Sequence, residues 1–242
     1  MEPQPAVPYD MTQIVKESQR RIKKALAEGF EYDHIVIAKS NQFLRTHVSQ
    51  KLDFAVMYID MVGSTRMSTK LAPDFLSRIV TVFSQEVSYA IERCHGLVLK
   101  FNGDAVISYF PPSSSALNDL NRVILCGEAT FYVVKHAINP LLLQMGHDGI
   151  DAKITSDFGQ HTILRYGSDY NRSHVDIISA TMNLAAKMQS VARGGQMIIG
   201  EKLYDKLDDD TKTKFAKAVL DKNRWNFHDL AEQKSYQLYW RS

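Results

Sequence analysis

Two aspartates stand where apolar segments of the chain meet glycine-containing turns. Asp60 ends the apolar run of residues 54–59, and Asp104 follows Asn102-Gly103 at the end of another hydrophobic segment. Carboxylates are rarely left at the edge of an apolar core unless a cation satisfies them, and two that lie close together raise each other's pKa unless cations bridge them. The pair therefore predicts a site for divalent cations and phosphate. The alternative is that both are turn residues that cap nearby N–H groups.

The segment after Asp60 is short and contains a glycine. It consists of Met61, Val62, Gly63, Ser64 and Thr65. Gly63 permits close backbone approach, and successive N–H groups of such a turn can cradle a phosphate. Gly-Ser-Thr is also common at the start of an ordinary helix, so the segment alone leaves both interpretations open.

A third set of polar residues lies near a helix predicted from residue 180 to about residue 191. Asn183 and Lys187 are four positions apart and share one face of this helix. A lysine there can contact a polyanion as a mobile point charge, and a solvated helix flank is the alternative. Asp176 precedes Asn183 by seven residues, and its position alone favours an N-cap of the helix.

The elements that must position these residues alternate between strands and helices. An uninterrupted apolar run such as residues 54–59 is typical of a strand buried on both faces, and Asn102-Gly103 is the strongest hairpin signal in the chain. Helices are predicted over residues 12–29, 73–93, 118–145, 180–191 and 202–207, and strands over residues 96–101, 105–110, 150–158, 161–166, 197–199 and within 225–240. This order predicts an α+β fold, with a ferredoxin-like antiparallel sheet and helices packed on it.

The remaining segments are expected to be less regular. Residues 30–52 read as an irregular connection, and the Pro-rich residues 1–10 as a flexible end. The N-terminal helix has a narrow apolar stripe, so it needs a partner, either its own domain or a second subunit.

Composition and charge exclude several classes of protein. The chain has 242 residues and a net charge of +2, which fits one sizeable domain plus an appendage and predicts neither nucleic acid nor membrane as a partner. Cys94 and Cys126 have no metal-ligand spacing and form no disulfide framework, and the N-terminus carries no secretory signal. A cytoplasmic location is therefore expected. A two-metal nuclease or polymerase palm would share the carboxylate pair, but it should carry a basic groove.

Taken together and in order, these motifs resemble the catalytic domain of class III nucleotide cyclases, the adenylate and guanylate cyclase family. Asp60-Met-Val-Gly-Ser-Thr65 is similar to the family's Asp-Ile-x-Gly-Phe/Ser-Thr, and Lys100-Phe-Asn-Gly-Asp104 is similar to its Lys-x-x-Gly-Asp hairpin. The segment from Asp176 through Thr181-Met-Asn-Leu-Ala-Ala-Lys187 is similar to the family's Asp or Thr followed by a Val-Asn-x-Ala-x-Arg helix. The resemblance covers roughly residues 52–240. It divides the chain into an N-terminal helical extension, residues 1–50, and a catalytic domain, residues 51–242.

The resemblance implies roles at the metal, phosphate and base positions. Asp60 and Asp104, with Met61 beside them, would hold two Mg²⁺ or Mn²⁺ ions. The amides of residues 61–65 would hold the β- and γ-phosphates of a nucleoside triphosphate. Lys100 and Asp176 would face the base, with Phe101 next to them.

The resemblance also implies how the substrate is activated and how the chain assembles. Asn183 would orient the ribose, and Lys187 would neutralise charge at the α-phosphate. The family's usual residue at that position is an arginine, and a lysine cannot make its bidentate contact, so turnover is lower or the pocket geometry differs. In this family the metal aspartates come from one subunit and the base and transition-state residues from the other. The resemblance therefore implies a homodimer with two active sites, each formed by residues of both subunits. The monomer should be inactive.

Hydrogen bonding alone does not identify the base of the substrate. Lys100 donates and Asp176 accepts, which fits adenine, cytosine and, with a shift, uracil. Phe101 and Ile177-Ile178 could fill the space that a pyrimidine leaves. The compact layout with a helical N-terminal extension resembles the Pycsar-type pyrimidine cyclases of bacteria, which implies that UTP is converted to cyclic UMP as a second messenger in antiphage defence. The alternatives are an adenylate cyclase that makes cyclic AMP and a catalytically inactive nucleotide-binding module.

Overall fold

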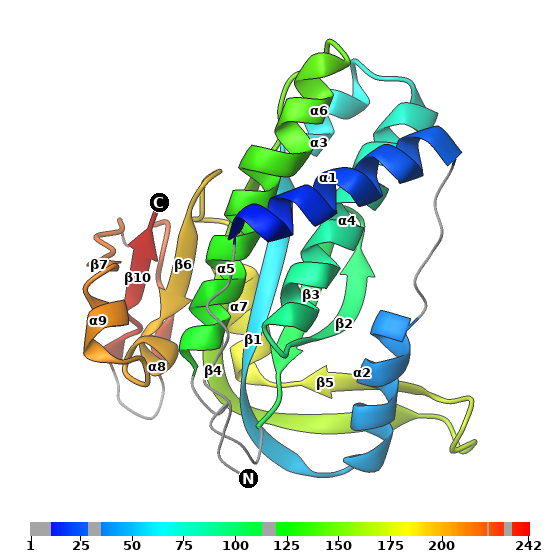
Figure 1. Ribbon diagram of the computed structural model, residues 1–242. Coiled ribbons are helices and arrows are strands. Elements are labelled where there is room, and N and C mark those ends of the chain that lie inside the picture. The colour runs from blue at the N-terminus through cyan, green and yellow to red at the C-terminus, as the bar shows by residue number, and fades with distance from the viewer. Residues whose placement is uncertain (1–10, 29–34, 113–119, 222, 230–233) are drawn as a thin grey trace, which may run out of the picture.

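A computed structural model describes residues 11–28, 35–112, 120–221, 223–229 and 234–242, and the predicted flexible segment of residues 1–10 lies outside them. In these residues an eight-stranded sheet has the order β2-β3-β1-β4-β6-β10-β7, with β5 paired to β4 (Figure 1). Its strands are β1 (Lys51–Val62), β2 (Leu97–Asn102), β3 (Ala105–Phe110), β4 (Asp151–Tyr166), β5 (His174–Ile178), β6 (Met197–Gly200), β7 (Ala216–Lys217) and β10 (Leu238–Arg241), and β8 (His228–Asp229) pairs with β9 (Lys234–Ser235) in a separate ribbon. All of these pairs are antiparallel except β4 with β6.

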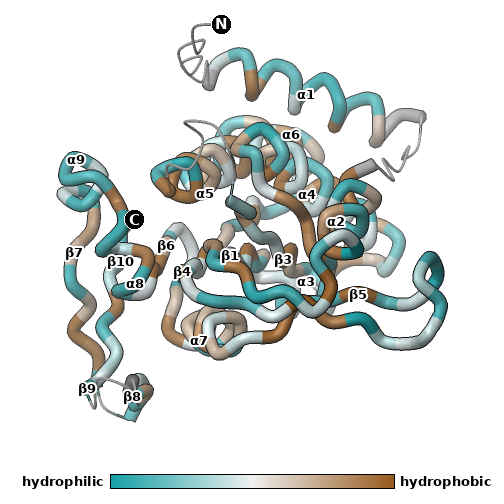
Figure 2. Tube along the Cα trace, turned by 90° about the horizontal axis from the view of Figure 1, so that it is seen from below, coloured by the Kyte–Doolittle hydropathy of each residue, from teal (hydrophilic) through white to brown (hydrophobic). Residues whose placement is uncertain are grey.

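The helices lie in layers on the two faces of the sheet. They are α1 (Met11–Glu28), α2 (Ile35–Thr46), α3 (Ser64–Ser68), α4 (Pro73–Arg93), α5 (Asn121–Val133), the π-helical η2 (Val134–Ile138), α6 (Asn139–Gln144), α7 (Ala180–Met188), α8 (Glu201–Tyr204) and α9 (Asp209–Lys212). Figure 2 shows α4, α5 and α6 on one side of the sheet, which we call the back face, and α7 on the other, the front face. The predicted α+β fold with an antiparallel-dominated sheet is confirmed.

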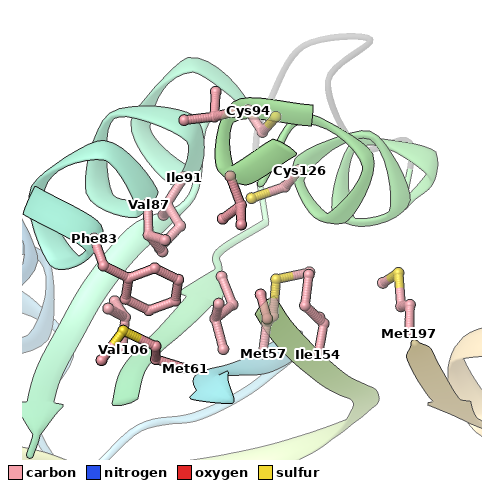
Figure 3. Packing of buried hydrophobic residues seen from close by; sticks show 14 of the residues in the cluster. Met57, Met61, Phe83, Val87, Ile91, Cys94, Val106, Cys126, Ile154 and Met197 are labelled. Atoms are coloured by element: carbon pink, nitrogen blue, oxygen red, sulfur yellow. The ribbon is translucent and has the colours of Figure 1, made fainter. Parts of the chain in front are cut away.

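β1 separates two apolar cores because its side chains alternate between the faces. Ala55, Met57 and Ile59 belong to the back-face cluster, where Phe83 and Ile91 of α4 pack against them. Figure 3 shows this packing, with Cys94 and Cys126 among the buried side chains. Both cysteines are free thiols, as the sequence predicts.

The front-face cluster is smaller and holds α7 against the sheet. Phe54 and Val56 of β1 pack with Met182 and Ala185 of α7 and with Leu44 of α2. The expectation of an irregular segment over residues 30–52 is therefore wrong in part. α2 forms within it because one face of this helix is buried on β2 and β5.

The sequence predicts two strands, residues 150–158 and 161–166, separated at Gly159, and this prediction is wrong. The structure has one strand across that position, with Gly159 paired to Phe54 of β1. A Cβ at residue 159 would lie 2.1 Å from Oγ1 of Thr181. The glycine therefore makes room for α7, and it does not mark a turn.

α1 packs across the back-face helices as a third layer (Figures 1 and 2). Its residues Ile14 and Ile22 are buried in the back-face cluster. Arg21 of α1 also reaches Glu86 of α4, with 2.6 Å between Nη2 and Oε2, and the Glu86 side chain is only 3% exposed. The partner that the narrow apolar stripe of α1 requires is thus supplied by the same chain. No helix among the described residues is both long and apolar enough to cross a membrane.

Candidate active site

The first carboxylate stands near the end of β1 on the front face. Tyr58 and Asp60 share that face, because Met57 and Ile59 point to the back-face cluster. In the β1–β4 pairing Asp60 is directly opposite Lys153, and Oδ2 of Asp60 lies 3.1 Å from Nζ of Lys153. The sequence analysis missed Lys153. Its only signal is this cross-strand position, which requires the β1–β4 register.

The second carboxylate lies at the same end of the sheet as the first, in the turn between β2 and β3. Asp104 follows Gly103, whose φ of 62° lets the β2–β3 hairpin turn back tightly. Ile59 pairs with Val106 in the β1–β3 ladder. Asp104 is the second residue of the two-residue turn between the paired Asn102 and Ala105, so it lies in the loop at the end of the sheet toward which β1 carries Asp60. The structure thus places both residues at the same end of the β1–β3 pair, and the convergence of their carboxylates on shared ions stays a prediction.

The ligands that these residues offer are oxygen atoms, which suit Mg²⁺ or Mn²⁺. The Met61 side chain is 2% exposed and packs in the back-face cluster, so only its backbone carbonyl is available. Among the described residues, no group of three or more His, Cys, Asp or Glu side chains converges on a point.

The turn after β1 leads into the short helix α3. Gly63 occupies the N-cap position with φ 99°, and no side chain caps the helix there. The Ser64 and Thr65 hydroxyls are therefore not used as an N-cap, and the first backbone N–H groups of α3 lack intrahelical acceptors, as at any helix start. The ordinary Ser or Thr cap is therefore absent at this helix start, and the phosphate cradle stays a prediction.

The predicted base-binding pair is formed within one chain. Nζ of Lys100 in β2 lies 2.5 Å from Oδ2 of Asp176 in β5. Asp176 lies inside a strand, and the N-cap of α7 is Ser179, so the N-cap interpretation of Asp176 is wrong. Phe101 is 46% exposed next to Lys100.

Tyr58 is a further residue at this position that the sequence analysis missed. Ile107 of β3 pairs with Lys100 of β2 on one side and with Tyr58 of β1 on the other. These three residues therefore form one row across the sheet. Burial and the negative charge of Asp176 raise the pKa of Tyr58 to about 12, so the phenol stays protonated at neutral pH. Tyr58 could have been predicted from sequence, because it lies two residues before Asp60 and side chains two apart in a strand share a face.

Asn183 and Lys187 occupy the exposed face of α7. The opposite face of the helix, with Met182, Ala185 and Met188, is buried. Nζ of Lys187 lies 3.3 Å from Oδ1 of Asn226. Within the residues that the structure describes, Lys187 thus has an amide partner and does not contact the two carboxylates.

Comparison with known proteins assigns this fold. The family model of the adenylate and guanylate cyclase catalytic domain matches residues 47–239. A uridylate cyclase of Rhodovulum sp. (strain MB263) is 26% identical over 79% of this chain and 81% of its own length. A cytidylate cyclase of Escherichia coli is 25% identical over 62% of this chain, and the match spans only 34% of that longer protein.

Solved structures of cyclases share the architecture. A crystal structure of a guanylyl cyclase has a TM-score of 0.66 and 17% identity, covering 79% of this chain and 92% of its own. An adenylyl cyclase of P. aeruginosa has a TM-score of 0.65 and 21% identity, covering 79% and 94% of the two chains. The resemblance noted from the motifs is confirmed, and the chain belongs to the family of adenylate and guanylate cyclase catalytic domains.

Proposed function

We propose that this chain is a nucleotide cyclase that converts UTP to 3′,5′-cyclic UMP and pyrophosphate. The observation that carries the cyclase reaction is the position of Asp60 and Asp104 at the same end of two paired strands. Divalent ions held by these carboxylates would lower the pKa of the ribose 3′-hydroxyl and clamp the triphosphate. The 3′-oxygen attacks the α-phosphorus in line, the bond to the bridging oxygen of the β-phosphate breaks, and pyrophosphate leaves.

The other site residues hold the triphosphate and its developing charge. Backbone N–H groups of residues 61–65 bind the β- and γ-phosphates. Lys153 neutralises Asp60 before the substrate arrives, and its flexible stem lets the ammonium turn to a phosphate oxygen afterwards. Asn183 orients the ribose, and Lys187 stabilises negative charge at the α-phosphate.

The site is proposed to form between two copies of the chain. Asn183 and Lys187 lie on an exposed helix face, where Lys187 contacts Asn226 and not the carboxylates. A second copy, facing head to tail, can present this face to Asp60 and Asp104. The boundary between an N-terminal extension, residues 1–50, and a catalytic domain, residues 51–242, remains part of this proposal.

Uracil is compatible with the hydrogen-bonding groups of the base position. Lys100 can donate to O4 of uracil, and Asp176 can accept from N3–H. Tyr58 is half-buried and close enough to Asp176 for its pKa to be raised by that charge, so we propose that its ring narrows the base position. The relative named uridylate cyclase, which aligns over most of both chains, supports the same choice.

An adenylate cyclase is the second candidate. The same Lys100–Asp176 pair can donate to N1 of adenine and accept from its N6 amine. A nucleotide-binding module without activity is the third, because one structural neighbour with a TM-score of 0.59 and 18% identity is described as a class III adenylyl cyclase-like ATP-binding protein. Both metal carboxylates are present in this chain, which speaks against the third candidate.

Incubation with each of the four nucleoside triphosphates and Mn²⁺ separates these candidates. Purified protein should form cyclic UMP from UTP, detected by mass spectrometry. If only ATP gives a cyclic product, the substrate is ATP and the proposal of UTP is wrong. The absence of any cyclic product would overturn the proposed cyclase activity. The proposed role in antiphage defence predicts that cellular cyclic UMP rises after infection and that an Asp104→Ala strain shows no rise.

A further inference from the structure

The helix that carries Asn183 and Lys187 must be fixed along its own axis if both side chains are to reach a substrate. α7 has nine residues, and its inner face is held mainly by apolar packing. Apolar burial is non-directional. Hydrogen bonds are directional, so they can set the axial position of a helix more sharply.

A chain of hydrogen bonds fixes the start of α7. Oγ of Ser179 accepts from the backbone N–H of Met182 at 2.9 Å and lies 2.8 Å from Nδ1 of His161. Nε2 of His161 lies 3.0 Å from the carbonyl oxygen of Phe54 in β1. Because a carbonyl can only accept, Nε2 carries the proton, and Nδ1 accepts the Ser179 hydroxyl. Burial lowers the pKa of His161 to about 4, so the imidazole is neutral, as this arrangement requires.

A second set of hydrogen bonds fixes the end of α7. Nε2 of Gln189 donates to the carbonyl oxygen of Tyr58 at 3.0 Å and to Oγ1 of Thr155 at 3.1 Å. The buried Thr155 hydroxyl in turn donates to the carbonyl oxygen of Ala185 at 2.8 Å. Tyr58 lies in β1, so the end of the helix is tied to a central strand of its own sheet.

We infer that these two sets of contacts form a clamp in which Ser179, His161 and Gln189 position Asn183 and Lys187 for the reaction. The inference rests on the proposed function. A helix cap alone needs only an acceptor at residue 179, whereas this hydroxyl also donates to a buried histidine. Gly159 supports the same picture, because any side chain there would push α7 away from the sheet.

Ser179 offers a mild and specific test in the full-length chain. Ser179→Ala removes both hydrogen bonds and should lower kcat about tenfold with little change in KM, since small displacements of site residues cost that much or more. Ser179→Thr keeps the hydroxyl and should retain activity close to wild type. Asp208→Ala is the matched control, because Asp208 caps α9 in the same way and α9 carries no site residue.

Gln189→Leu tests the other end of the clamp. It removes the donor to Tyr58 and Thr155 and should also lower kcat more than it changes KM. Full kcat in both Ser179→Ala and Gln189→Leu, while wild type is active, would overturn the clamp. A wild-type protein that makes no cyclic product would instead overturn the proposed function itself.

Mixed dimers separate positioning from general destabilisation. A dimer of one Asp104→Ala chain and one Asn183→Ala chain has one intact site, with α7 from the first chain and the carboxylates from the second. Ser179→Ala added to the first chain should lower its activity about tenfold, and added to the second it should have little effect. Equal losses in the two arrangements would show that Ser179 acts through overall stability and would contradict the inference.

Discussion

Lys153 stands directly opposite Asp60 in the β1–β4 pairing, and its Nζ lies 3.1 Å from the Asp60 carboxylate. The two side chains are 24% and 26% exposed, so the pair is partly solvated. An ion pair of this kind contributes about 0–1 kcal/mol. In the absence of substrate, Lys153 thus competes weakly with any cation that approaches Asp60.

Lys153→Met should therefore raise the affinity of the nucleotide-free protein for Mn²⁺. Removal of the competing ammonium would give an increase of up to about fivefold, which corresponds to about 1 kcal/mol. Turnover should fall at the same time, since the triphosphate loses a cationic partner. Metal titration by electron paramagnetic resonance measures the first effect. Lys214→Met, which removes the lysine paired with Glu128 far from the site, is the control, and an equal gain there would contradict the assignment.

Asp60→Ala and Asp104→Ala should each abolish cyclase activity without unfolding the protein. Neither side chain is buried in a core cluster, so the free energy of unfolding should change by no more than about 1 kcal/mol, the upper value for the Asp60–Lys153 ion pair. Activity and denaturant midpoints are measured on the same samples. Asp53→Ala is the control at the other end of β1 and should keep activity. Undiminished turnover in either variant would remove the carboxylate pair from the mechanism.

The positions of these two aspartates could be predicted from sequence because the signals are local. The apolar run that precedes Asp60 in β1 and the hairpin turn at Gly103-Asp104 are both set by neighbouring residues. The local period of two puts Tyr58 on the same face as Asp60, but the pairing of Asp60 with Lys153 and the place of Tyr58 in the row of Lys100 depend on which strands pair and in which register. Local residues do not encode that information.

Two errors in the predicted fold have the same origin. Gly159 looks like a turn residue, but α7 approaches the sheet there, and only the packed structure shows why a side chain is absent. The apolar residues of α2 gather at positions 35–38 and 43–44 and show no clear helical period, so its helix was not predicted. Burial of Leu44 between β2 and β5 stabilises it in the fold.

Lys187→Ala should lower kcat about 100-fold, with a smaller change in KM, if the ammonium acts on charge that develops at the α-phosphate. Steady-state kinetics with UTP and Mn²⁺ give both constants. Asn226→Ala is the control, because it removes the partner of Lys187 at 3.3 Å and leaves the charge in place. A rise in KM alone would assign Lys187 to ground-state binding.

The pH dependence of stability should show two opposing contributions. Burial lowers the pKa of His161 from 6.5 to about 4. Between these values the unfolded chain binds more protons at residue 161, so the free energy of unfolding falls as the pH falls. Burial raises the pKa of Asp157 from 3.8 to about 7. In that window the folded chain binds more protons at residue 157, so the free energy of unfolding rises as the pH falls.

Asp157→Asn should isolate the Asp157 contribution, because the His161 contribution is common to the variant and wild type. The amide oxygen can keep the N–H groups of Phe158 and Leu203, and the amide nitrogen can donate to Tyr236, so the fold should tolerate the change. Between pH 4.5 and 6.5, the free energy of unfolding of the variant relative to wild type should rise with pH by about 1.4 kcal/mol per unit. Denaturant unfolding at several pH values measures this difference. Asp205→Asn, at an exposed aspartate, controls for the loss of one charge, and parallel profiles for wild type and Asp157→Asn would show that the buried carboxyl does not take up a proton in this range.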